Sequence, residues 1–175
     1  MELHLQSHHY VRRMPDWRAA AVAGLIAGAI YMVLELLTAR FLLYQGAWGT
    51  VKMVAALLLG REALASADTF SWTIVLMAGI VHFGLSVVMA CVLAMFIAAF
   101  RFDSSFAMAS AVGIAFGVAA YFVNFYVFGR YFNWFNEARG WESMFAHALF
   151  GLVAADAYMH FERHGTDMSP DAVRR

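Results

Sequence analysis

Apolar residues along this chain fall into four long stretches, and short polar segments separate them. A helix needs about 20 residues to cross roughly 30 Å of hydrocarbon, and each stretch is near that length or beyond it. Both prolines, Pro15 and Pro170, lie outside the four stretches, so each stretch can form an uninterrupted helix. The pattern predicts an all-α membrane protein with transmembrane helices at about residues 19–43, 72–100, 106–128 and 141–160.

The connections between these predicted spans differ in length. Residues 101–105 are a tight turn, whereas residues 44–71 are a long link. Within that link, residues 51–59 are apolar but too short to cross a membrane, and charged residues flank them, which is typical of an interfacial helix. We therefore expect an up-down-up-down bundle with a short interfacial helix between the first and second spans. The expected organisation is a cytoplasmic segment 1–18, a transmembrane domain 19–160 and a polar tail 161–175.

Composition supports the membrane prediction. Of the 175 residues, 63% are hydrophobic and 14% are charged, whereas a soluble domain is about half apolar and about a quarter charged. The formal net charge is zero, so no nucleic-acid partner is expected. Cys91 is the single cysteine, which excludes an internal disulfide and a site built from several thiolates. Residues 1–18 are polar and basic, and the apolar run after them is too long for a secretory signal peptide.

Basic and aromatic residues indicate an orientation. Seven arginines fall on the side of the bundle that carries the two termini, against five basic residues on the other side. An excess of basic residues marks the cytoplasmic side, so both termini are predicted to be cytoplasmic. Aromatic residues that resemble an interfacial belt cluster at the opposite ends of the spans, namely Tyr44, Trp48, Trp72, Tyr131, Trp134 and Trp141.

Four polar residues lie inside the predicted spans: Glu35, His82, Asn124 and His147. At 1.5 Å per residue, all four lie within about 6–15 Å of span ends that share one side of the membrane. Ionisable and polar side chains inside hydrocarbon are costly and mark functional sites by default. The sequence therefore predicts a shared polar pocket in the outer half of the membrane.

The first and third spans share a spacing of two glycines followed seven residues later by a polar residue. The matching residues are Gly24, Gly28 and Glu35 in the first span, and Gly113, Gly117 and Asn124 in the third. The chain is thus either two related helical hairpins in parallel, as occurs in transporters, or a chance recurrence of glycine. Small residues let helices approach closely in lipid. The predicted packing glycines are Gly24, Gly28, Gly79, Gly113, Gly117 and Gly151.

Several chemistries fit the predicted pocket. Glu35, His82 and His147 could bind a divalent metal, and the two histidines could hold a haem iron. The same groups could relay protons or bind a polar ligand. In a purely structural cluster, each histidine would donate to a backbone carbonyl, and Glu35 would bond to His82 or Asn124. The spacing does not choose among these, and no metalloprotease, phosphate-loop or nucleophile-elbow motif is present.

Several longer stretches carry a resemblance to a known family. These are GLIAGAIYMVLELL at 24–37, WGTVKMVAALLLG at 48–60, VHF around His82, NFY at Asn124 and WFNEARGWESMFAHALFG at 134–151. They look like a family of small, uncharacterised four-span bacterial inner-membrane proteins, over about residues 17–160. The resemblance implies a four-helix protein of the inner membrane, and it carries no established activity.

The leading functional hypothesis is a membrane module without a catalytic motif, embedded in the lipid bilayer. It would be an accessory subunit of a larger membrane complex or a homo-oligomer, and its pocket would hold a ligand or lock the bundle. One alternative is a small transporter or channel for protons, metal ions or a polar solute. A second alternative is a haem-binding electron carrier that uses His82 and His147.

Overall fold

A computed structural model of the chain describes residues 14–42, 46–65, 69–102 and 105–167. All secondary structure in these ranges is helical. The α-helices are α1 (Trp17–Phe41), α2 (Ala47–Leu59), α3 (Glu62–Ala65), α4 (Trp72–Phe100), α5 (Phe106–Phe122) and α6 (Trp141–Asp167). Between α5 and α6 lie a π-helical stretch, η2 (Val123–Val127), and two 3₁₀ turns, η3 (Phe128–Arg130) and η4 (Asn133–Ala138).

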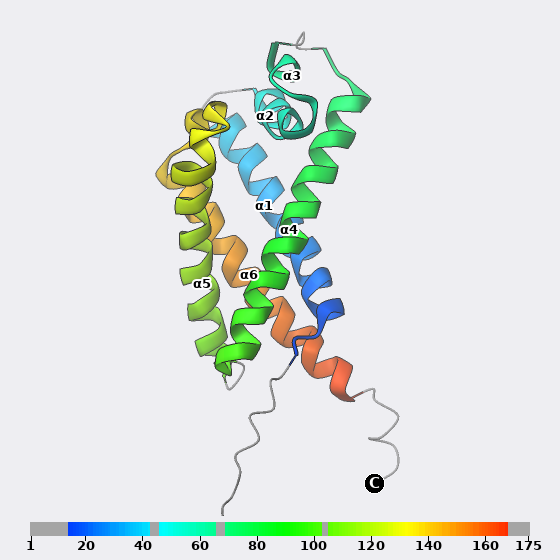
Figure 1. Cartoon of the computed structure of the whole chain (residues 1–175), viewed down its shortest axis with the longest axis vertical. Helices are drawn as coiled ribbons and strands as arrows, with labels where there is room; N and C mark the ends of the chain where they lie inside the picture. The colour runs from blue at the N-terminus through cyan, green and yellow to red at the C-terminus, as the bar shows by residue number, and fades with distance from the viewer. Residues whose placement is uncertain (1–13, 43–45, 66–68, 103–104, 168–175) are drawn as a thin grey trace, which may run out of the picture.

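The four long helices alternate in direction (Figure 1). Helices α1 and α5 run toward the end of the bundle at which α2 and α3 lie, and α4 and α6 run back. We call the end with α2, α3 and η4 the capped end, and the end where α1 begins the terminal end. This arrangement makes the chain an all-α bundle in which helices adjacent along the sequence are antiparallel.

Three helical segments are long and apolar enough to cross a membrane: Trp17–Phe41, Trp72–Phe100 and Phe106–Arg130. These three segments are the signature of an integral membrane protein. Helix α6 is long enough but less apolar, because residues such as Glu142, His147 and Asp156 interrupt it. The structure thus supports three of the four predicted spans by length and composition, and the fourth stays a prediction.

Helix α6 nevertheless lies at the centre of the bundle, packed along α5 on one side and α1 on the other. Ala154, Ala155, Tyr158 and Met159 on α6 are almost fully buried, together with alanines of α1 and the Leu93 region of α4. The neighbouring helices therefore cover much of α6, which lowers the cost of polar residues on that helix in a membrane.

Glycines allow two pairs of helices to approach closely. A Cβ atom added at Gly24 on α1 would lie 2.8 Å from the Ser86 carbonyl oxygen on α4. A Cβ atom at Gly117 on α5 would overlap the His147 carbonyl oxygen on α6. Close backbone approach of this kind maximises van der Waals contact between helices in lipid. By contrast, a Cβ atom at Gly79 would meet nothing within 4 Å, so this glycine makes no comparable approach.

The two close pairs share one register. Gly24 faces Ser86 and Ala90, which follow His82 by four and eight residues. Its counterpart Gly113 faces Gly151 and Ala155, which follow His147 by the same four and eight residues. The contact of α1 with α4 is therefore repeated in the contact of α5 with α6.

Replacing Gly117 by valine should destabilise the bundle by roughly 1–3 kcal/mol, the usual cost of overpacking a close contact. The valine side chain would collide with the backbone at His147 and Ala148. Gly79→Val is the matched control, since it places the same residue in a helix where space is open. Thermal unfolding in detergent micelles measures both, and equal losses from the two substitutions would contradict this packing.

Candidate functional site

The polar residues at the capped end of the bundle gather where α1 meets α6. Tyr31 and Glu35 lie one helical turn apart on α1, and Ser143 and His147 lie one turn apart on α6. Residues four apart share one helix face, so each helix presents two polar side chains to the other. Hydrogen bonds join these four side chains into a single group, which we call the Glu35 cluster.

The Glu35 carboxylate accepts hydrogen bonds from two hydroxyl groups. Ser143 Oγ donates to Glu35 Oε1 over 3.2 Å. The Tyr31 hydroxyl is a second hydrogen-bond partner of this carboxylate. A carboxyl group removed from water is costly unless it is hydrogen-bonded. The two hydroxyls therefore allow Glu35 to lie between apolar helices.

The surroundings of His147 determine which ring nitrogen carries the proton. Its Nδ1 atom lies 2.7 Å from the Ser143 carbonyl oxygen and 3.2 Å from the Tyr31 hydroxyl. A carbonyl oxygen can only accept, so Nδ1 carries the hydrogen and donates it to Ser143. The Tyr31 hydroxyl then has no acceptor at Nδ1, which leaves its proton for Glu35. In the neutral ring the lone pair lies on Nε2.

Aromatic rings surround the His147 imidazole, which is only 8% exposed. Tyr31 meets it edge-on at a centroid distance of 5.0 Å, Tyr121 at 5.7 Å and Phe125 at 5.9 Å. These rings come from α1, α5 and η2. His147 is therefore held in one orientation by both its hydrogen bonds and its packing.

His82 joins this group through the Tyr31 ring. Its imidazole stacks on Tyr31 at a centroid distance of 5.9 Å and an interplanar angle of 28°. Its Nε2 atom donates to the Gly28 carbonyl oxygen of α1 over 2.8 Å. The close approach at Gly28 brings that carbonyl within reach. Both histidines thus donate to a backbone carbonyl, His82 across helices and His147 within its own helix.

Asn124 is not brought into the Glu35 cluster. It lies in η2, where the helix widens from α to π geometry, and it is half-exposed. The π stretch bonds residue i to i+5 instead of i+4, so the α-helical register that relates Asn124 to Gly117 does not continue through η2. Among the described residues, no hydrogen bond links the Asn124 side chain to Glu35, His82 or His147.

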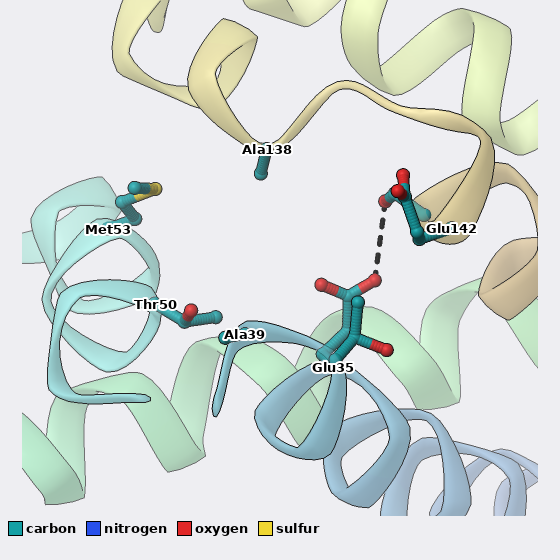
Figure 2. A pocket seen from close by; sticks show the side chains of 8 residues that line it. Glu35, Ala39, Thr50, Met53, Ala138 and Glu142 are labelled. Atoms are coloured by element: carbon teal, nitrogen blue, oxygen red, sulfur yellow. Dashed lines mark hydrogen bonds between the residues drawn. The ribbon is translucent and has the colours of Figure 1, made fainter. Parts of the chain in front are cut away.

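A small, partly enclosed pocket lies beside Glu35 at the capped end (Figure 2). Thr50 and Met53 of α2 face Glu35 across it, and Ala138 of η4 lies above. The lining residues are Glu35, Thr38, Ala39, Thr50, Met53, Ala138, Glu142 and Ser143. Two are carboxylates, three carry hydroxyl groups and none is basic. This pocket therefore offers oxygen atoms, chiefly hydrogen-bond acceptors, to whatever enters.

The predicted metal and haem sites are not assembled in this arrangement. Among the described residues, no group of three or more His, Cys, Asp or Glu side chains converges as metal ligands would. Glu35 meets the hydroxyls of Tyr31 and Ser143 instead of an imidazole. The Tyr31 ring packs against both His82 and His147, so the two imidazoles do not face each other as a haem held by both requires.

Sequence reasoning missed Tyr31 and Ser143 as members of the cluster, and Glu142 as a pocket residue. Tyrosine, serine and a glutamate near a helix end are common in membrane proteins, so none of them stands out alone. The available signal was spacing, because Tyr31 precedes Glu35 by four residues and Ser143 precedes His147 by four.

A smaller polar group lies at the terminal end. Ser110 Oγ on α5 donates to Asp156 Oδ1 on α6 over 2.6 Å. The Tyr158 hydroxyl donates to Glu162 over 3.1 Å and accepts from the Asp16 backbone nitrogen over 3.3 Å. These bonds tie the start of α1 and of α5 to α6, and the Gly113–Gly151 contact separates them from the Glu35 cluster.

A comparison with protein-family models found no match for the chain, and comparisons with curated proteins and with solved structures found none either.

Removing either hydroxyl that serves Glu35 should destabilise the bundle. We expect Tyr31→Phe and Ser143→Ala each to cost about 1–3 kcal/mol, because a half-buried carboxyl group loses a donor. The double variant should deviate from additivity by about 0.5 kcal/mol or more, since both donors serve one acceptor. Thermal or denaturant unfolding measures this, with Tyr126→Phe, at a half-exposed ring on η2, as the control. Strict additivity would contradict a shared acceptor.

Proposed function

We propose that this chain is an integral membrane module without a catalytic motif, whose pocket at the capped end binds a small polar ligand through Glu35. The observation that carries the proposal is the position of the Glu35 carboxylate. It lies within a membrane-spanning helix, two hydroxyls hydrogen-bond it, and it lines a pocket. A carboxyl group in such a helix is expensive to maintain, which favours a role beyond packing.

The lining of the pocket favours a ligand that is cationic or donates hydrogen bonds. Carboxylates and hydroxyls supply the polar atoms, and the lining contains no lysine, arginine or histidine. Oxygen-rich sites suit hard cations, and carboxylates also take up protons or pair with ammonium groups. The proposed ligand class is therefore a small cation, with the proton as its simplest member.

We further propose that α6 is the fourth span and that the bundle consists of two related hairpins. The central position of α6 supports the first point, because α1 and α5 cover its polar face. The second point is supported by a repeated contact, because Gly24 packs on α4 at the same spacing from His82 as Gly113 packs on α6 from His147. On this basis the chain would have both termini on one side of a bacterial inner membrane, as the family resemblance and the basic residues predict.

An accessory subunit or a homo-oligomer is the proposed context, since the part of the chain that the structure describes has little mass outside its helices. Such a subunit should copurify with a larger complex from its native membrane. The pocket beside Glu35 also favours one alternative, a transporter for the same small cations. Liposome flux distinguishes the two, because a transporter should show a pH-dependent flux that Glu35→Gln abolishes.

The binding proposal predicts ligand-induced stabilisation. The thermal unfolding of the purified protein is recorded at rising concentrations of Na⁺, K⁺, Ca²⁺ and methylammonium in turn. The pH is varied in a separate series to titrate the protein with protons. At about 100 times the dissociation constant a ligand stabilises the folded state by about 2.7 kcal/mol. We expect at least one of these titrants to give a saturable rise in the unfolding temperature, and we expect Glu35→Gln to remove that rise.

Glu62→Gln is the matched control for that experiment. Glu62 is exposed on α3 at the same end of the bundle and is not part of the pocket lining. The control should keep the full stabilisation. If no titrant stabilises the unaltered protein, or if Glu35→Gln responds as strongly, the binding proposal fails.

A further inference from the structure

Two segments far apart in the sequence cover the pocket. Thr50 and Met53 come from α2, and Ala138 comes from η4. They lie opposite Glu35 and Glu142, which belong to the long helices α1 and α6 (Figure 2). The pocket is therefore enclosed between the bundle on one side and a cap on the other, where the cap is α2, α3 and η4.

Specific contacts join the two parts of this cap. Trp134 Nε1, on η4, donates to the Met53 carbonyl oxygen on α2 over 3.2 Å. Arg61, beside α3, donates to Asn133 Oδ1 over 2.9 Å, and its guanidinium carbon lies 5.7 Å from the centre of the Trp134 ring. Met53 both lines the pocket and carries the carbonyl that Trp134 holds. These contacts therefore couple the position of α2 over the pocket to η4.

The apolar contacts of α2 are separate from the main core. Ala55 on α2 forms a small buried cluster with Ile74 and Ala78 at the start of α4. The main core instead joins α1, α4, α5 and α6 around Leu93 and Tyr158. Segments with few buried apolar contacts open at lower free energy than the core does. Opening at α2 would therefore break this small cluster with α4 and leave the main core of the bundle intact.

Glycines lie at both ends of α2. Gly46 precedes the helix and Gly60 follows it, and a Cβ atom on either would meet nothing within 4 Å. Gly60 has φ +80°, a conformation that glycine adopts far more readily than other residues do. Hinges are element-terminal positions that absorb large backbone changes. Both ends of α2 thus suit a hinged movement.

We infer that the cap is a lid over the Glu35 pocket, and that Trp134 and Arg61 form its latch. In the closed state, the Trp134–Met53 and Arg61–Asn133 contacts hold α2 and η4 together above Glu35. Breaking these contacts lets α2 turn about its glycine ends and exposes the pocket to the aqueous phase at the capped end. This inference goes beyond the proposed function, because it concerns access to the pocket and holds for any occupant.

Cysteine labelling tests the lid directly. Ala39 lines the pocket and is 4% exposed, so Ala39→Cys in a Cys91→Ala background reports on access to the pocket. The reagent is a small, membrane-impermeant, cationic methanethiosulfonate. Combining Trp134→Phe with Arg61→Gln removes the latch donors and keeps an aromatic ring at position 134. We expect the labelling rate to rise about tenfold, which corresponds to about 1.4 kcal/mol in the opening equilibrium.

Two controls separate lid opening from general loosening. Ala27→Cys reports on the core, since Ala27 is fully buried on α1, and its labelling should stay negligible in every background. Arg130→Gln removes an exposed arginine outside the cap and should leave labelling at position 39 unchanged. The inference is overturned if the latch substitutions leave the rate at position 39 unchanged, or raise the rates at positions 39 and 27 equally. It is also overturned if position 39 labels at the rate of a free thiol with the latch intact.

Discussion

The need to hydrogen-bond one carboxyl group inside an apolar bundle explains much of this structure. Glu35 accepts from Tyr31 on its own helix and from Ser143 on α6. The second donor can reach Glu35 only if α6 packs directly against α1. Because α6 carries Ser143 and His147, it is too polar to face lipid on all sides. It accordingly lies between α1 and α5. The polar residues and the central position of α6 thus have a common cause.

Close contact between helices allows the hydrogen bonds and ring contacts of the two histidines, His82 and His147. His82 reaches the Gly28 carbonyl oxygen because glycines let α1 approach α4. The same register brings Gly113 and Gly117 of α5 against α6, where His147 is fixed by the Ser143 carbonyl and the ring of Tyr31. In lipid, helices gain little from the hydrophobic effect between them, so such contacts and interhelical hydrogen bonds hold the bundle together.

Much of the fold could be predicted from the sequence, because apolar length is a strong signal in a membrane protein. The stretch 72–100 coincides with α4, and α1 and α6 begin within two residues of their predicted starts. The short apolar helix also exists, although it extends over Ala47–Leu59. The third span begins where predicted and extends to Arg130, but its helix changes from α to π and 3₁₀ geometry after Phe122. Hydropathy does not report such changes of helix type.

The candidate site was predictable only in part. Glu35 and His147 were identifiable because ionisable side chains are rare in apolar stretches, and the structure joins them through Ser143 and Tyr31. Those two hydroxyls carry no such signal in the sequence. Asn124 was placed by extending an α-helical register into a stretch that is π-helical. The cap over the pocket depends on contacts between residues some 80 positions apart, such as Met53 and Trp134, which local patterns do not reveal.

The proposed topology requires α6 to cross the membrane between α1 and α5 and to hold the Glu35 cluster against α1. The direct measurement is the sidedness of single cysteines at the two ends of this helix, Gly140→Cys before it and Glu162→Cys near its end, in a Cys91→Ala background. Labelling with an impermeant maleimide in sealed, oriented vesicles reports the side of each position. We expect the two positions to label from opposite sides. Labelling of both from one side would mean that α6 does not span the membrane, and it would contradict the enclosed cluster.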